Sequence, residues 1–351
     1  SSIRTLTGMI QNEHFDIVHC HGSRANMIGA ILKRTIKVPI VTTVHSDYRL
    51  DYLGRPFHRL TYGTINTVAL RVFDYHIGVS DAMVQLLISR GFDPQKLFSI
   101  YNGVEFPPKP ANLARAEYLG SLGITFDADT VVFGIAARLN PVKDIATLIR
   151  GFAGACRTCS NIRLIIAGDG EERKMLEQLA EETCPAGSVI FAGWVKDTDS
   201  FYNAIDVNML TSLSEGSPYA LVEGARMRCA TIATAVGGIP YMMESGVTGL
   251  LFTPRDVDTL TAYMVRLVQN PAFRKQLGQN FYEKAERVYS AEATVHHQLE
   301  IYKTILRQAQ RPKEKRRGVT ICGAYGKGNA GDEAILKAIL RQLQHIDPDM
   351  P

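Results

Sequence analysis

Short runs of β-branched and other apolar residues alternate with longer amphipathic segments along most of this chain. In the amphipathic segments, apolar side chains recur three and four positions apart, as in Leu148, Ile149, Phe152 and Ala155, which is the spacing of one buried helix face. Strands that alternate with helices form parallel sheets covered by helices on both faces, so we predict an α/β fold. The predicted strands are Ile17 to His21, Ile40 to His45, His76 to Ser80, Leu97 to Tyr101, Val131 to Ala137, Arg163 to Gly168, Val189 to Gly193, Val207 to Thr211 and Thr231 to Val236.

Two proline-containing stretches divide this series. In Phe106-Pro107-Pro108-Lys109-Pro110, three prolines remove backbone donors and fix φ, so neither a helix nor an inner strand can continue. The length of 351 residues accommodates two domains and part of another, and we expect the chain to be cut at its start. The expected regions are a first α/β domain over 1–106, a linker over 107–111, a second α/β domain over 112–309, a basic linker over 310–318 and a third region over 319–351.

Composition narrows the class of protein. Apolar residues make up 46% and charged residues 21%, which is the usual globular mixture. The net charge of +4 comes entirely from the stretch between Arg311 and Arg317, which holds five basic residues and one acidic residue. We therefore expect no nucleic-acid partner. The six cysteines are too few and scattered for a disulfide framework, which favours a reducing cytoplasm, and no second pair completes a metal site with Cys156 and Cys159.

Candidate chemistry in the second domain lies where strands end. Arg138 follows one strand and Lys143 precedes the next helix, a pair of cations suited to a diphosphate, although two ordinary surface cations would look the same. After a later strand, Glu215 stands in a loop and Glu223 about two turns into a helix. At about 10 Å apart they do not match the roughly 5 Å pair of a retaining hydrolase, so we expect them to bind different parts of one long ligand; a capped helix with one buried Glu is the alternative. The segment between them offers backbone amides to phosphate and comprises Gly216, Ser217, Pro218, Tyr219, Ala220 and Leu221.

In combination these motifs resemble the family-4 retaining glycosyltransferases of the GT-B fold, in which two Rossmann-like domains face a cleft. The resemblance covers about residues 3–308 and includes Gly168-Asp169-Gly170, Phe191-Ala192-Gly193, Val236-Gly237-Gly238-Ile239-Pro240 and Gly249-Leu250-Leu251-Phe252. It implies that Arg138 and Lys143 hold the donor diphosphate, Glu215 contacts the transferred sugar and Glu223 the ribose, with Gly168 and Asp169 also on the donor side. The sequence departs from the family at Cys229-Ala230-Thr231, where Gly-x-Pro is usual.

The first half resembles the later strand ends of the acceptor domain of this family. His45 is the main catalytic candidate there, with His19, His21, Gly22, Ser80 and Asn102 as further acceptor-side candidates. A structural histidine is the alternative at His45, and one imidazole packed inward is the alternative for His19 and His21, because a metal site would need a third ligand. The opening strand and glycine-rich loop of the family are missing, so the N-terminal domain is expected to be incomplete and the chain weakly active or inactive.

The resemblance implies transfer of a sugar from a nucleotide diphosphate to a hydroxyl group with retention of configuration, without cofactor or metal. Cations and helix-end amides would stabilise the leaving diphosphate. The acceptor would be a cell-surface or cell-wall polysaccharide or a lipid-linked precursor of bacterial type. The aromatic and basic stretch Tyr48 to Arg59 could dock on an anionic membrane surface at the inner face, or form a solvated loop. A nucleotide-sugar epimerase and a carbohydrate-binding pseudoenzyme are the alternative functions.

The third region begins with a strand, Val319 to Gly323, and the glycine pattern Gly326-x-Gly328-x-x-Gly331. Alone this pattern is a weak dinucleotide fingerprint. The full stretch resembles the start of polysaccharide pyruvyl transferases, which implies a fused second enzyme that uses phosphoenolpyruvate and whose catalytic residues lie beyond Pro351. The basic linker would then tether two enzymes.

Overall fold

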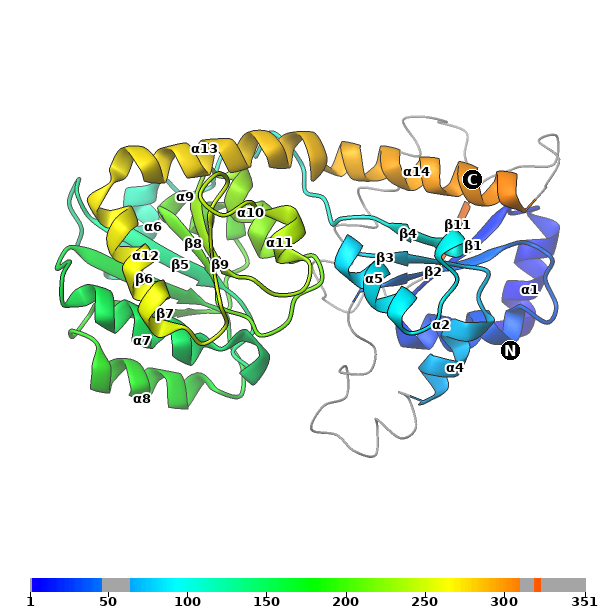
Figure 1. The fold of residues 1–351 in the computed structure, drawn as a ribbon, viewed down its shortest axis with the longest axis horizontal. Helices are drawn as coiled ribbons and strands as arrows, with labels where there is room; N and C mark the ends of the chain where they lie inside the picture. Colours follow the sequence, from blue (N-terminus) through cyan, green and yellow to red (C-terminus); the bar gives the residue numbers. More distant parts are fainter. Residues whose placement is uncertain (1, 46–63, 310–318, 323–351) are drawn as a thin grey trace. The chain divides into compact units, whose positions relative to one another are not determined.

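The computed structural model describes residues 2–45, 64–309 and 319–322, and these form two compact α/β units (Figure 1). The first unit takes its residues from 1–103 and 291–351, and the second comprises 104–290. The stretch Tyr48 to Arg59 and the glycine pattern after Gly323 lie outside the described residues. In the described part, no helix is both long enough and apolar enough to cross a membrane.

The first unit is built on a five-stranded parallel sheet with the order β11-β1-β2-β3-β4. Its strands are β1 (Ile17–His21), β2 (Ile40–Val44), β3 (Tyr75–Gly78), β4 (Leu97–Ser99) and β11 (Val319–Cys322). Its helices are α1 (Ser2–Asn12), α2 (Gly22–Leu32), α4 (Thr64–Val72), α5 (Asp81–Ser89), the 3₁₀ turn η2 (Pro94–Lys96) and α14 (Ala291–Gln308).

Alternation along β1 gives this sheet two different faces. Val18 and Cys20 pack into a core with Leu32 of α2 and Leu70 of α4. Ile17 points the other way, into a core with the apolar stripe of α14. The members of that stripe are Ile301, Tyr302, Ile305 and Leu306, all at most 9% exposed.

The second unit contains a six-stranded parallel sheet with the order β10-β9-β8-β5-β6-β7. Its strands are β5 (Val131–Ala136), β6 (Ile162–Ala167), β7 (Val189–Gly193), β8 (Val207–Leu210), β9 (Ala230–Thr234) and β10 (Leu250–Phe252). Its helices are α6 (Arg115–Ser121), η3 (Pro141–Lys143), α7 (Ile145–Cys156), α8 (Arg173–Thr183), α9 (Thr198–Ala204), α10 (Tyr219–Arg226), α11 (Ile239–Met242), α12 (Val257–Gln269) and α13 (Pro271–Val288).

Helices cover both faces of the second sheet as well. One core joins Phe133 and Ile135 of β5 to α7, α8 and α12, and the other joins Val132 of β5 to α6 and α9. The predicted α/β fold with two parallel sheets is therefore confirmed, and all nine strands expected from the sequence form.

The units divide the chain differently from the expected domains at α14. The sequence placed this helix at the end of the second domain, whereas in the structure it belongs to the first unit. The reason is its buried stripe, since each large apolar side chain removed from water stabilises the packing by about 1.5–3 kcal/mol. The strand expected at the start of the third region forms as β11 and pairs with β1 in the first sheet; the third domain itself stays a prediction.

Candidate active site

Strand order in the second sheet places a ligand site between β5 and β8. From β5 the chain moves outward through β6 and β7, then returns to the other side of β5 as β8, so the direction of winding reverses there. Ligands of open α/β sheets bind at such a switch point, beyond the carboxyl ends of the strands. Arg138 and Lys143 follow β5, and Glu215 follows β8, so the predicted charged residues lie on the two loops that flank this point.

The structure brings Lys143 and Glu215 together. Lys143 Nζ lies 2.5 Å from Glu215 Oε1, and the hydroxyl of Ser212 donates to the same oxygen at 2.6 Å. The Thr211 hydroxyl donates to the Lys143 carbonyl oxygen at 2.9 Å, so the loops after β5 and β8 are fastened to each other. The Glu215 side chain is only 11% exposed and the Lys143 side chain 27%. An anion at this site would therefore meet an ammonium group that is already positioned.

Arg138 and Lys143 differ in their surroundings. Arg138 is exposed, and its guanidinium makes no ion pair with any residue that the structure describes. Lys143 ends the 3₁₀ turn η3, and Asp144, in the left-handed region at φ 45°, redirects the chain into α7. The free cation at Arg138 and the paired cation at Lys143 can together serve a ligand with two phosphate groups.

Glycines allow the loops to approach closely at this edge. A Cβ on Gly168, at φ 138°, would lie 1.8 Å from the carbonyl oxygen of Ala137, while the Gly168 amide donates to Gly193 O at 2.6 Å. Asp169 accepts from the Gly170 amide at 2.8 Å and faces Arg173 at 3.5 Å. The Gly168-Asp169 turn therefore packs directly against the strand end that leads to Arg138.

A second glycine turn supports Glu215. Gly237 has φ 52°, and a Cβ there would lie 1.8 Å from the Glu215 carbonyl oxygen. The same oxygen accepts the amide of Gly238 at 3.1 Å. The loop after β9 thus holds the backbone of Glu215 in place, which explains why glycines follow Val236.

The amides expected to meet phosphate are only partly available. Pro218 is the residue before α10, and the Leu221 amide donates to its carbonyl oxygen at 3.1 Å, so the expectation that Leu221 offers a free amide is corrected. Ser217 is 6% exposed, and its hydroxyl points to the sulfur of Met242 at 3.8 Å. Ala220 uses its carbonyl oxygen to accept from Asn208 Nδ2 at 2.9 Å, which fixes the start of α10 on β8. Gly216 and Tyr219 flank these residues in the chain.

Glu223 sits deeper in α10. Burial raises the pKa of its carboxyl group, and this is opposed by the charge of Arg226 and by the nearby hydroxyl group of Tyr202. Arg226 in turn pairs with Asp199. The Glu223 carboxyl is therefore poorly hydrated, and a ligand hydroxyl that donated to it would stabilise its charged form.

The first unit holds the histidines. His19 is fully buried on the face of β1 that meets α14, where its Nδ1 is hydrogen bonded to Tyr302 Oη at 2.5 Å and its Nε2 to Thr43 Oγ1 at 2.8 Å. Both ring nitrogens are thus used inside the protein. Burial lowers the pKa of His19 to about 3, so the ring is neutral at physiological pH.

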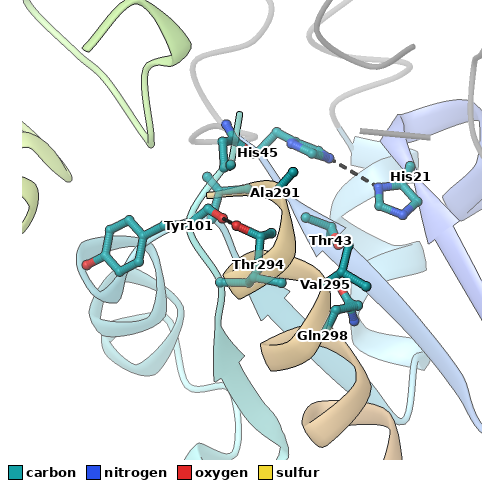
Figure 2. A pocket seen from close by; sticks show the side chains of 12 residues that line it. His21, Thr43, His45, Tyr101, Ala291, Thr294, Val295 and Gln298 are labelled. Carbon is teal, nitrogen blue, oxygen red and sulfur yellow. Dashed lines mark hydrogen bonds between the residues drawn. The ribbon is translucent and has the colours of Figure 1, made fainter. Parts of the chain in front are cut away.

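His21 lies on the same face of β1 as His19 because side chains two positions apart share a face. The two rings stack with centroids 4.2 Å apart, and His21 Nδ1 is 3.3 Å from His45 Nε2 (Figure 2). Burial also lowers the pKa of His21 well below its usual value. A third imidazole therefore does stand near the pair, yet no group of three or more ligands in the described part of the chain is arranged to hold a metal ion.

A pocket opens beside His21 and His45 and encloses about 490 Å³ of empty space, part of it open to solvent. The predicted residues His21, His45 and Asn102 line it. The remaining lining residues are Thr43, Val79, Ile100, Tyr101, Gly103, Ala291, Thr294, Val295 and Gln298 (Figure 2). Asn102 is thus brought together with the histidines by the end of β4.

Two other acceptor-side candidates, Ser80 and Gly22, stabilise local structure next to the sheet. The Ser80 hydroxyl accepts the amide of Met83 at 3.2 Å and so caps α5, and Ser80 is 1% exposed. Gly22, at φ 81°, turns the chain from β1 into α2. Neither is among the lining residues of the pocket.

Sequence reasoning missed Thr43, Tyr302 and Gln298. Thr43 could have been found because it lies two positions before His45 on a predicted strand. Gln298 interrupts the apolar stripe of α14 and is only 5% exposed, which is the mark of a buried polar group on a helix face. Nothing local pointed to the contact between Tyr302 and His19, which joins residues 283 positions apart.

Comparisons with known families identify the chain. The family model described as Glycosyltransferase Family 4 matches residues 1–106, and that described as Glycosyl transferases group 1 matches residues 124–284. Together they cover about three quarters of the chain. The chain is a family-4-like glycosyltransferase.

Relatives of this glycosyltransferase carry similar names. It is 26% identical over 313 residues to an uncharacterized glycosyltransferase of Methanocaldococcus jannaschii, covering 84% of this chain and 77% of the relative. It is 25% identical over 278 residues to the UDP-Gal:alpha-D-GlcNAc-diphosphoundecaprenol alpha-1,3-galactosyltransferase of Escherichia coli, covering 77% and 70%.

Solved structures agree on the fold. The complex of Anabaena HepE with UDP-glucose superposes with a TM-score of 0.70 at 24% identity, covering 86% of this chain and 81% of the other. Sucrose-phosphate synthase from Thermosynechococcus elongatus gives a TM-score of 0.72 at 20% identity, covering 88% and 78%. The predicted GT-B fold of this glycosyltransferase is therefore confirmed.

Proposed function

We propose that this glycosyltransferase transfers a sugar from a nucleoside diphosphate donor to a hydroxyl group of a cell-surface polysaccharide or lipid-linked glycan, with retention of configuration at the anomeric carbon. The observation that carries the proposal is the meeting of Lys143 and Glu215 at the switch point of the second sheet, with Arg138 exposed on the same loop as Lys143. A cation pair beside a carboxylate suits a ligand that joins a diphosphate to a polyhydroxylated ring.

The donor would exchange partners with Glu215. When the diphosphate arrives, Lys143 turns from the carboxylate to the phosphate oxygens, and Glu215 is released to accept hydrogen bonds from the sugar hydroxyls. As the bond between the anomeric carbon and the diphosphate oxygen breaks, negative charge grows on the leaving group, and Arg138 and Lys143 stabilise it. The acceptor oxygen forms the new bond to the anomeric carbon, and its proton passes to the diphosphate oxygen that leaves.

The printed names of similar proteins support the substrate classes. The Anabaena structures contain UDP or UDP-glucose, and the name of the Escherichia coli relative specifies a UDP-galactose donor and an undecaprenol-linked acceptor. A lipid-linked acceptor is held in the membrane, so we propose that the transfer reaction takes place at the inner, cytoplasmic face of the cell membrane. Direct metal participation is not part of the proposal, because the two cations and Glu215 account for the donor contacts.

The test is to incubate the intact protein, that is the 351-residue chain together with any sequence that its gene encodes before Ser1, with labelled UDP-glucose, UDP-galactose or UDP-N-acetylglucosamine and with an undecaprenyl diphosphate-linked sugar. Label on the acceptor, with an anomeric configuration equal to that of the donor by NMR, supports the proposal. An isomerised free donor would support an epimerase instead, and tight donor binding without conversion would support a carbohydrate-binding pseudoenzyme.

Lys143→Ala tests the assignment of the diphosphate site. We expect it to lower turnover by two or more orders of magnitude, the size of effect seen when one donor to a developing anion is removed. Lys174→Ala, at an exposed position on α8 of the same unit, is the matched control and should retain activity. Equal turnover of the two variants would contradict the role of Lys143.

We also propose that residues 319–351 begin a polysaccharide pyruvyl transferase, on the strength of the glycine-rich sequence that follows β11. This part of the proposal is independent of the first. It is tested by assaying pyruvate transfer from phosphoenolpyruvate to a glycan, using the chain together with any sequence that follows Pro351 in its gene. Absence of that transfer would refute the fusion and leave the glycosyltransferase untouched.

A further inference from the structure

Gln298 is a polar residue on the buried, apolar face of α14. It lies on the face of α14 that packs on the first sheet, between Val295 and Ile301, which are each 3% exposed. Gln298 itself is 5% exposed, and its Nε2 has no hydrogen-bond partner among the residues that the structure describes. A buried donor left unpaired is destabilising, so the stripe would be more stable with an apolar residue at this position.

The same side chain lines the pocket next to the histidines (Figure 2). Two other polar lining groups already have partners inside the protein. The Thr43 hydroxyl is bound to His19 Nε2, and the Thr294 hydroxyl donates to the Tyr101 carbonyl oxygen at 3.3 Å. Gln298 therefore differs from them in offering an unused donor to whatever enters the pocket.

The part of the pocket lining that the structure describes also carries no fixed charge. Its described lining residues include no Asp, Glu, Lys or Arg. Of its imidazoles, His21 is kept neutral by burial, which lowers its pKa. A phosphate or carboxylate entering the pocket would lose its hydration without gaining a counterion, which is costly, whereas a hydroxyl group needs only hydrogen bonds. Val79, Ile100 and Val295 add apolar walls of the kind that pack against the C–H faces of a sugar ring.

We propose that Gln298 is a specificity-determining residue of this pocket, where its amide Nε2 donates a hydrogen bond to a hydroxyl oxygen of an uncharged sugar or polyol ring. The proposal rests on the proposed function, because it assigns this ring to the acceptor rather than to the donor. It adds that α14, a helix that follows the whole second unit in the chain, contacts the acceptor that is bound to the first unit.

The test measures binding and stability together in the full chain. Saturation-transfer NMR and titration calorimetry use methyl α-D-glucopyranoside, methyl α-D-galactopyranoside and myo-inositol as uncharged probes, and glucose 6-phosphate as the charged probe. The variants are Gln298→Leu, which removes the amide at similar size, and Gln298→Glu, which replaces the donor by a carboxyl group. Gln308→Glu, at an exposed position on the same helix, is the matched control.

We expect at least one uncharged probe to bind more tightly than glucose 6-phosphate. Gln298→Leu and Gln298→Glu should weaken that binding at least about tenfold, the effect of losing one hydrogen bond worth about 1.4 kcal/mol, while Gln308→Glu leaves it unchanged. Gln298→Leu should also raise the thermal midpoint, since it removes an unpaired buried amide. A purely structural glutamine would show the opposite, namely a lower midpoint with unaltered probe affinity, and that result would overturn the proposal.

Preferential binding of glucose 6-phosphate, or probe affinities that are equal in wild type and Gln298→Leu, would also overturn it. Failure of the proposed function gives a different pattern. In that case UDP-sugars are not converted, yet the uncharged probe still binds in a Gln298-dependent way. If UDP-sugars are converted and no uncharged probe binds, the proposed function stands and the role of Gln298 is refuted.

Discussion

Acid should unfold the first unit before the second, because buried neutral histidines are confined to the first. All nine histidines of the sequence lie outside residues 104–290, so the second unit contains none. In the first unit, burial lowers the pKa of His19 to about 3 and that of His76 to about 4, and it lowers the pKa of His21 well below 6.5. On unfolding, each of these rings regains its ordinary affinity for protons.

The magnitude follows from the linkage between proton binding and folding. Between pH 6.5 and the folded pKa, the unfolded state binds one more proton per histidine than the folded state, so stability falls as the pH falls. For His19, with a folded pKa of about 3, the loss at pH 5 relative to pH 8 is about 2 kcal/mol, from 1.5 pH units at about 1.36 kcal/mol each. His76 adds a similar amount at that pH, so the two together remove about 4 kcal/mol of stability from the first unit.

The assay is urea unfolding at several pH values, followed by pulsed hydrogen exchange and mass spectrometry with every labelling pulse at one fixed pH. Peptides of the first unit should lose protection at lower urea as the pH falls from 7 to 5, and those of residues 131–269 should not. His19→Gln should remove the share of this pH dependence that comes from His19, about 2 kcal/mol between pH 8 and pH 5, and leave the shares of His21 and His76, whereas His14→Gln, at an exposed position before β1, should keep all of it. An equal shift in both units, or a full pH dependence in His19→Gln, would refute the reasoning.

Two further predictions concern backbone packing. Gly237→Ala places a Cβ 1.8 Å from the Glu215 carbonyl oxygen and should weaken UDP binding about tenfold or more in calorimetry, whereas Gly187→Ala, also at positive φ but with nothing within 4 Å, should cost only about 1–2 kcal/mol of stability. Equal UDP affinity in the two variants would contradict the support that we assign to Gly237. Ending the chain at Ala309 removes β11 and uncovers the edge of β1. Calorimetry should then show a lower thermal midpoint for the first unit and an unchanged midpoint for the second unit. The fluorescence of Trp194, which lies in the second unit, identifies the transition of that unit. An unchanged midpoint in the first unit would show that β11 does not stabilise the sheet.

Local periodicity made the strands predictable, but it could not assign every helix to a sheet. The nine expected strands form because each is a short β-branched run bounded by turn residues. Periodicity does not predict the short strand β10, Leu250–Phe252, because its three residues are too few to show an alternating pattern. The stripe of α14 was visible in the sequence, yet the sequence shows only that the stripe is apolar and not which sheet covers it.

The donor-side residues can be predicted from the sequence more easily than the acceptor-side pocket, because they follow strands directly. Lys143 and Glu215 each follow a strand directly, and parallel strands bring their carboxyl ends to one edge, so their meeting follows from topology. Gln298 reaches the pocket only because α14 returns to the first unit after 187 intervening residues of the second unit, 104–290.

The contacts of His19 explain why the packing of α14 on the first unit also affects the shape of the pocket. His19 is bound at one nitrogen to Tyr302 of α14 and at the other to Thr43 of β2, while Thr43 and Gln298 both line the pocket. Tyr302 lies four positions after Gln298, one helical turn along the same helix, so the contact that fixes Tyr302 also fixes the position of the Gln298 backbone. His19 is not among the lining residues of the pocket, and both of its ring nitrogens are hydrogen bonded inside the protein, so we infer that it positions the residues that line the pocket and does not act as an acid or base.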